Sequence, residues 1–297
     1  MPLQSPLNLR VPRNLTATLQ LIQRLVGREQ HQHYCDGVIP VERVSHFLHK
    51  MTDRYPQILR TTRERSYDRR RHGHAAMHMI VFPPPASMPL SSVSTIHWLL
   101  LSDRGKGGLA DERSADFRVS RDAMSSHGHI EAEDYVLLYA SKRRPSRLED
   151  RAGSRSRFIF TECSTWTWKI RGEVTREIRA AIDERCRALD LGAELLPPYA
   201  GGGLRALLAA QRRRPLFSGV RNQVIDLHRY AAEAWLPYRN AWLARHPRLA
   251  LDLGPIAGAL TSARAIMQCD LPTMSQLRLY GTPPRTVCDL LADAVRT

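Results

Sequence analysis

The chain has 297 residues, of which 43% are hydrophobic, and its formal net charge at pH 7 is +15. This length allows a sizeable core, and no apolar run approaches the roughly 18 residues of a membrane-spanning helix. The 44 basic residues are 40 arginines and 4 lysines, an excess that causes self-repulsion unless a polyanion is bound. Composition therefore favours a nucleic-acid partner and excludes a membrane protein. Because the first residues do not resemble a secretory signal, we expect a cytoplasmic location.

The N-terminal part is expected to be helical. Asn14 is a typical N-cap, and apolar residues recur behind it at helical spacing to about Gly27. Residues 28–37 are interpreted as a polar break. A second helix, opened by Pro40, carries one apolar stripe and should end before Pro56.

A β-rich core is expected from residue 59 to 171. From Arg60 the hydrophobic period changes towards two, which predicts a strand over residues 72–82 that ends at three prolines. Three further strands are predicted, at residues 96–102, 135–141 and 158–170. The polar segment 103–134 is too long for a tight hairpin loop, and the basic segment 142–157 is predicted to be an exposed, flexible loop.

The C-terminal part is expected to be helical throughout. Helices are predicted at 173–191, at 204–212, from Ser218 to about 245 with an interruption at Pro237, and from Thr282 onwards. The predicted fold is therefore α+β, with a mainly antiparallel central sheet flanked by N-terminal and C-terminal helices. Its segments are an N-terminal helical part (1–58), a β-rich core (59–171) and a C-terminal helical region (172–297).

Runs of arginine, some of them next to aromatic residues, indicate where nucleic acid would bind. Arginines neutralise phosphates, and aromatic rings stack on bases. Trp166 and Trp168 share one face of their predicted strand, so both contact nucleic acid or both pack in the core, and we favour the core for at least one of them. The predicted contact residues are Arg63, Arg65, Arg69, Arg70, Arg71, Lys142, Arg143, Arg144, Trp166, Trp168, Lys169, Arg212, Arg213, Arg214 and Arg221.

Histidines raise the alternative of a metal-dependent nuclease or nickase. In a strand, His72, His74 and His78 would share one face, and Tyr139 with Lys142 has the spacing Y-x-x-K. His72 and His74 would hold a divalent metal, and Tyr139 would attack the phosphorus atom. A nucleophile of this kind needs an exposed helix, whereas Tyr139 lies in a predicted strand, so we do not favour this alternative.

The other candidate ligands do not predict a metal site or a cofactor. His31, His33 and Cys35 lie in the polar break without the second half of a four-ligand site, so they are expected to be solvated. The glycine-rich stretch 104–108 lacks the hydroxyl residue of a phosphate-binding P-loop and is expected to be a flexible turn. No metal, cofactor or defined reaction is therefore predicted.

Four stretches in order, HWLLLSDRGKGG, DYVLLYASK, STWTWKI and PLFSGVRNQV, resemble uncharacterised proteins carried by plasmids and integrative conjugative elements. The resemblance covers about residues 70–230 and implies a bacterial mobile-element setting, with other proteins of the same machine as partners. We expect a DNA- or RNA-binding protein that mainly contacts the phosphate backbone. A scaffold that binds an acidic protein is a further alternative.

Overall fold

The structure is a computed structural model of the whole chain. It describes residues 5–85, 92–111, 121–125, 128–149, 156–191, 202–245, 266, 269, 271–272 and 274–295. Within these ranges, side chains are not described for residues 142–149, 156–162, 188–191, 202, 242–243 and 295. The fold is α+β, as predicted, but the described strands form two antiparallel sheets instead of one central sheet.

The chain divides into two compact units. Unit 1 contains residues 1–132, 137–166 and 276–297, and unit 2 contains residues 133–136 and 167–275. The N-terminal helices and the first strands therefore belong to the same unit. The predicted boundary at residue 171 lies close to the start of the helical part of unit 2, but the last residues of the chain belong to unit 1.

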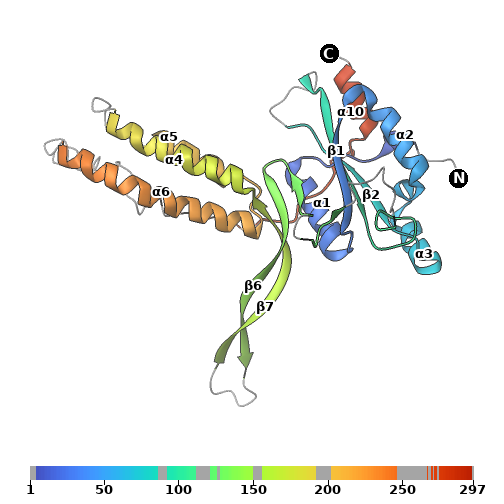
Figure 1. Cartoon of the computed structure of the whole chain (residues 1–297), viewed down its shortest axis with the longest axis horizontal. Coiled ribbons are helices and arrows are strands. Elements are labelled where there is room, and N and C mark those ends of the chain that lie inside the picture. The colour runs from blue at the N-terminus through green and yellow to red at the C-terminus, as the bar shows by residue number, and fades with distance from the viewer. Residues whose placement is uncertain are drawn as a thin grey trace. The chain divides into compact units, whose positions relative to one another are not determined.

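Unit 1 is organised around a four-stranded sheet (Figure 1). Its strands, in the order β2-β3-β1-β4, are β2 (Met77–Val81), β3 (Thr95–Ser102), β1 (His33–Pro40) and β4 (Arg121–Asp122). Strand β1 pairs along its whole length with β3, from His33 opposite Ser102 to Pro40 opposite Thr95. The prediction of a polar break over residues 28–37 is therefore wrong from His33 onwards. The segment is polar but lies between two partner strands, and pairing of its backbone determines its conformation.

Two N-terminal helices and the last helix of unit 1 correspond to helices predicted from the sequence. The helices of this unit are η1 (Pro6–Asn8), α1 (Leu15–Arg28), η2 (Val41–Arg43), α2 (Val44–Arg54), η3 (Pro56–Leu59), α3 (Thr62–His72) and α10 (Val287–Val295). The Asn14 side chain accepts a hydrogen bond from the Ala17 amide at 2.9 Å, which confirms the predicted cap of α1. The last helix begins later than predicted, because Thr286 caps it by accepting a hydrogen bond from the Asp289 amide at 3.3 Å.

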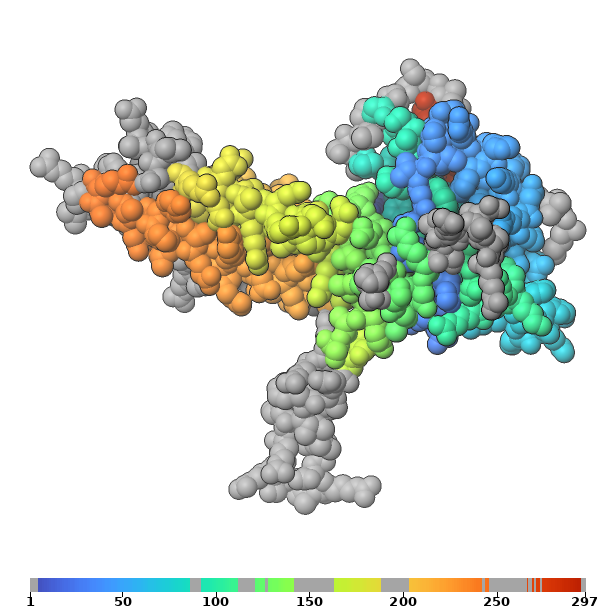
Figure 2. Space-filling model, viewed as in Figure 1, coloured from blue at the N-terminus to red at the C-terminus, as the bar shows by residue number. Residues whose placement is uncertain are grey.

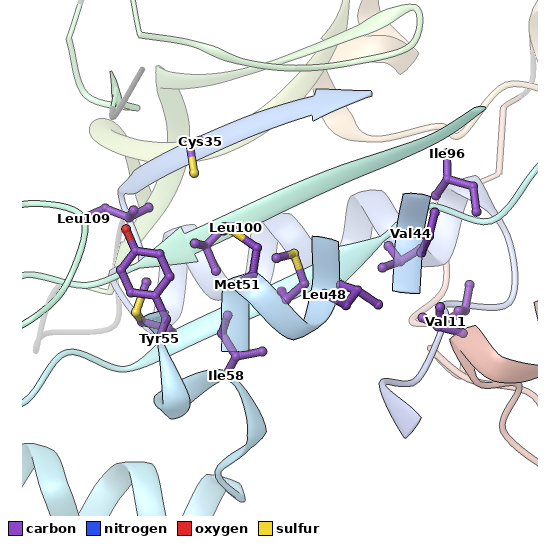
Figure 3. Packing of buried hydrophobic residues seen from close by; sticks show 14 of the residues in the cluster. Val11, Cys35, Val44, Leu48, Met51, Tyr55, Ile58, Ile96, Leu100 and Leu109 are labelled. Carbon is purple, nitrogen blue, oxygen red and sulfur yellow. The ribbon is translucent and has the colours of Figure 1, made fainter. Parts of the chain in front are cut away.

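One face of this sheet is covered by a hydrophobic cluster (Figure 3). Leu48 and Met51 of α2 pack with Leu100 of β3 and with Tyr55 and Ile58, which follow α2. Met77, Met79 and Val81 of β2 and Val287 and Leu290 of α10 belong to the same cluster. Burial of this apolar surface stabilises the unit by roughly 25 cal/mol per Å² removed from water.

Helix α3 replaces the predicted switch to strand at residue 60. Thr61 and Glu64 form a reciprocal capping box at its start, and Gly73, with a φ of 67°, ends it. Strand β2 begins only at Met77, so the prediction of one strand over 72–82 is wrong for its first half. The shared face proposed for His72, His74 and His78 is wrong for the same reason, because the turn at Gly73 breaks the alternation.

A three-stranded sheet has the order β5-β6-β7, with β5 (Ile130–Ala132), β6 (Tyr135–Glu149) and β7 (Ser156–Ile170). Strands β6 and β7 form a long ribbon (Figure 1). The flexible loop predicted over 142–157 is therefore wrong for residues 142–149 and 156–157, which are strand. Two strands that pair with each other satisfy their backbone groups even where the residues are basic and polar.

Unit 2 is mainly helical. It contains α4 (Gly172–Leu191), α5 (Gly202–Arg212) and α6 (Ser218–Arg245), which lie side by side (Figure 1). Helix α6 passes through Pro237 without the predicted interruption. None of the described helices is both long enough and apolar enough to cross a lipid bilayer.

Hydrogen bonds join the end of β7 to the start of α6 within unit 2. The Gly219 amide donates to Thr167 Oγ1 at 3.0 Å. The side-chain amide of Gln223 bonds both backbone groups of Ile170, at 2.7 and 2.9 Å. Trp168, between these contacts, is fully buried and lies against Phe217, with ring centroids 6.4 Å apart. This packing supports the core role for Trp168.

We predict that Trp168→Ala lowers the free energy of unfolding by about 3–5 kcal/mol, because it leaves a large cavity in unit 2. Leu236→Ala, at a 43% exposed position of α6, is the control and should change the stability little. Urea denaturation followed by circular dichroism measures both. Unchanged stability of Trp168→Ala would contradict the core role.

Candidate functional site

Helix α3 is unusual because none of its eleven residues is buried. It lies at the edge of unit 1 (Figures 1 and 2). Two of its arginines attach it to the rest of the unit. Arg65 Nη1 donates to the Met77 carbonyl at 2.8 Å, and Arg69 Nη1 lies 3.1 Å from Oδ2 of the buried Asp103. Arg65 and Arg69, both predicted to contact nucleic acid, therefore have structural roles.

The other arginines of α3 point into solvent. Arg63, Arg70 and Arg71 are exposed, and no ion pair joins them to a carboxylate of the described residues. Arg63 also lines a shallow pocket of about 460 Å³ together with Arg60, Glu64, Tyr67 and Asp68. Three of the five predicted arginines of this run are thus available to an external anion.

Aromatic rings accompany these arginines. Tyr67 is 53% exposed, and its ring centroid lies 6.2 Å from that of His72. The His72 ring lies in turn 5.6 Å from that of His74. Tyr67 was not predicted as a site residue from the sequence, although an aromatic residue within an arginine run is a recognisable signal for nucleic-acid contact.

The turn after β3 joins this region. The Lys106 amide donates to the Gly73 carbonyl at 2.8 Å, and the Ala75 amide donates to the Lys106 carbonyl at 3.0 Å. A Cβ at Gly105 would lie 2.5 Å from the Ala75 backbone, so only glycine fits there. The turn over residues 104–108, which was predicted to be flexible, is therefore hydrogen-bonded to the end of α3. Arg104 and Lys106, both exposed, line a second shallow pocket of about 470 Å³.

We call this region the α3 basic surface. Its members are Arg63, Tyr67, Arg70, Arg71, His72, His74, Arg104 and Lys106. They combine exposed cations with aromatic rings on adjoining elements of one unit. Such a combination can neutralise phosphates and stack on bases.

The remaining predicted contact residues do not join this surface. The side chains of Lys142, Arg143 and Arg144 lie outside the described residues. Trp166 is 6% exposed and Trp168 is fully buried, so neither ring is free to stack on a base. Lys169 is half-buried.

The arginines near the start of α6 are partly committed to other contacts. Arg214 forms an ion pair with Asp134 at 2.8 Å and a hydrogen bond with the Tyr135 hydroxyl at 3.3 Å. Arg212 bonds His228 at 3.3 Å, and Arg221 is half-buried. Arg213 is exposed. The Gly219 amide at the helix start donates to Thr167, so this amide is not free to bind a phosphate.

The nickase alternative gains no support from the placement of its residues. His72 ends α3, and His74 forms an isolated bridge with Lys106. Tyr139 lies on strand β6, as expected, and its ring is next to Trp166, with centroids 5.4 Å apart. No contact among the described residues joins Tyr139 to either histidine.

A second cluster lies beneath α3 and contains Glu29, His31 and His78, whose ligand atoms all lie within 4.8 Å of one another. His31 is only 2% exposed, as is Cys35, so the prediction that these two residues are solvated is wrong. The residue before it, Gln30, has a φ of 59° and reverses the chain between the end of α1 and β1. This reversal places His31 inside the unit and leaves Glu29 beside it.

Burial and positive charge keep both histidines of this cluster neutral. Burial lowers the pKa of His31 below its usual value. Burial, together with the nearby Arg65 guanidinium and His31, lowers the pKa of His78 to about 2. Arg65 Nη1 lies 2.8 Å from His78 Nδ1 and 2.9 Å from Nε2.

We predict that acid destabilises the protein through His78. Below pH 6.5 the unfolded chain protonates this histidine while the folded chain does not. The free energy of unfolding therefore decreases as the pH is lowered, until the folded pKa of about 2 is reached. His78→Gln should reduce this dependence by up to about 1.4 kcal/mol per pH unit. Urea denaturation at several pH values below 6.5 measures it, with exposed His46→Gln as control. Equal slopes in wild type and His78→Gln would contradict the prediction.

Comparison with protein-family models, with curated proteins and with solved structures found no match to this chain. The similarity to proteins of mobile elements therefore stays a prediction from the sequence.

Proposed function

We propose that this protein binds single-stranded nucleic acid through the α3 basic surface. The observation that carries the proposal is α3 itself, a helix with no buried residue that presents three arginines for which the described residues supply no acidic partner. A helix that contributes no side chain to the core needs another reason for its position at the surface. Binding a polyanion supplies one, because it offsets the repulsion among Arg63, Arg70 and Arg71.

The aromatic rings favour nucleic acid over an acidic protein as the partner. Tyr67 exposes 53% of its surface among cations, and His72 and His74 extend the row of rings. Bases that are not paired can stack on such rings, whereas an acidic peptide would use the charges alone. Either DNA or RNA satisfies these contacts, and a role within a plasmid or mobile-element machine is part of the proposal.

We predict that replacing Arg63, Arg70 and Arg71 together by alanine weakens binding to a short single-stranded oligonucleotide. Each lost phosphate contact should also make the slope of log affinity against log salt shallower by about 0.7. The control replaces Arg176, Arg205 and Arg229 of unit 2, which are exposed helical arginines and change the net charge equally. Fluorescence anisotropy at several salt concentrations measures both.

The two triple variants separate a defined surface from a general charge effect. The proposal requires the α3 variant to lose more affinity than the unit 2 variant, at unchanged thermal stability. Equal losses in both variants, or wild-type affinity that does not change with salt, would contradict it.

We predict that Tyr67→Ala weakens binding by about 1–3 kcal/mol, the usual contribution of one stacked base, while Tyr67→Phe retains most of the affinity. Tyr139→Ala is the matched control, because Tyr139 is 51% exposed but lies outside the α3 basic surface. The same anisotropy titration measures all three variants. If Tyr67→Ala and Tyr139→Ala have equal effects, Tyr67 does not stack on a base.

A further inference from the structure

The imidazole of His31 has no hydrogen-bond partner among the described residues. Both ring nitrogens are buried, and neither Nδ1 nor Nε2 is bonded to another group in that part of the chain. The residue is only 2% exposed. An unsatisfied buried polar atom costs about 1–3 kcal/mol, so a ligand at this position would remove a real penalty.

Glu29 and His78 face this imidazole. Their ligand atoms and that of His31 all lie within 4.8 Å of one another, and His78 Nε2 lies 3.9 Å from Glu29 Oε2. The rings of His31 and His78 meet edge to face, with centroids 4.8 Å apart. We propose that Glu29, His31 and His78 form a binding site for one divalent transition-metal ion.

The elements that carry the three ligands explain why they converge. Glu29 is the C-cap of α1, and the His31 amide donates to the Leu25 carbonyl at 3.0 Å, which holds the chain against that helix. His78 projects from β2 on the face opposite Met77 and Met79, which belong to the hydrophobic cluster. All three ligands therefore come from backbone that is fixed by α1 or by the sheet.

The donor set selects the class of metal. Two neutral imidazoles and one carboxylate suit Zn²⁺, Co²⁺ and related ions better than Mg²⁺ or Ca²⁺, which prefer oxygen ligands. Three protein ligands leave at least one coordination position for water or for another molecule.

Arg65 competes with the metal for His78. Its Nη1 lies within hydrogen-bond distance of the His78 ring and also donates to the Met77 carbonyl at 2.8 Å. A guanidinium at this distance repels a dication, so metal binding requires Arg65 to leave the His78 ring. Arg65 also attaches α3, so the metal and the α3 basic surface would be linked through one side chain. The metal site itself does not depend on the proposed function.

The test uses the full chain, stripped of metal with a chelator and titrated with Zn²⁺ by calorimetry and with Co²⁺ by visible absorption. We expect one equivalent to bind the wild type and to raise its melting temperature. Glu29→Gln and His78→Gln should each weaken binding by about tenfold or more. His33→Gln, two residues from His31 but outside the cluster, is the control and should bind as the wild type does.

Arg65→Met tests directly whether the Arg65 guanidinium weakens metal binding. It removes the positive charge and leaves a long, unbranched side chain. This variant should bind Zn²⁺ about tenfold more tightly than the wild type. The proposal is overturned if neither protein binds the metal, or if only Arg65→Met does, since Arg65 would then close the site in the native chain. It is also overturned if Glu29→Gln and His78→Gln bind Zn²⁺ as the wild type does.

Discussion

Two arginine contacts join α3 to the sheet of unit 1, and no residue of this helix is buried. Arg65 reaches the carbonyl of Met77 on β2, and Arg69 reaches the buried carboxylate of Asp103 after β3. Asp103 also accepts a hydrogen bond from the Ala76 amide at 2.9 Å. The backbone therefore holds in place the carboxylate that pairs with Arg69. Removing Arg69, which is itself half exposed, would leave the buried Asp103 carboxylate without its cation, and such a loss is costly. These contacts can therefore hold a helix that has no apolar stripe.

The five arginines of α3 therefore fall into two groups, those that attach the helix and those that remain exposed. Arg65 and Arg69 turn towards the sheet, while Arg63, Arg70 and Arg71 remain exposed. The same residue type thus serves the fold and the proposed function on one helix. An experiment that removes all five arginines would confuse loss of structure with loss of binding, whereas replacing only Arg63, Arg70 and Arg71 leaves both attachments in place.

Sequence periodicity predicted the elements that have an apolar stripe. Helices α1, α2 and α4 and strand β3 lie close to their expected bounds. Helix α3 was missed because it has no apolar period, although the reciprocal cap formed by Thr61 and Glu64 was a readable signal. Strand β1 was missed because its polar residues suggested a loop, and only the partner strands reveal the pairing.

The candidate site was less predictable than the fold. The arginine run was identified from the sequence, but which arginines turn inward depends on Met77 and Asp103, which are distant in the chain. The cluster of Glu29, His31 and His78 depends on a chain reversal at Gln30 and on the placement of β2. No local pattern joins residues 29 and 31 to residue 78, so only the tertiary structure could bring them together.

The most direct measurement of the central claim is photochemical crosslinking of the full chain to a bromouridine-containing single strand, with the crosslinked residues located by mass spectrometry. The account predicts crosslinks within residues 61–74, at Tyr67 or at His72 and His74, whose rings lie next to one another. Crosslinks confined to α4, α5 and α6, with none in residues 61–74, would contradict it.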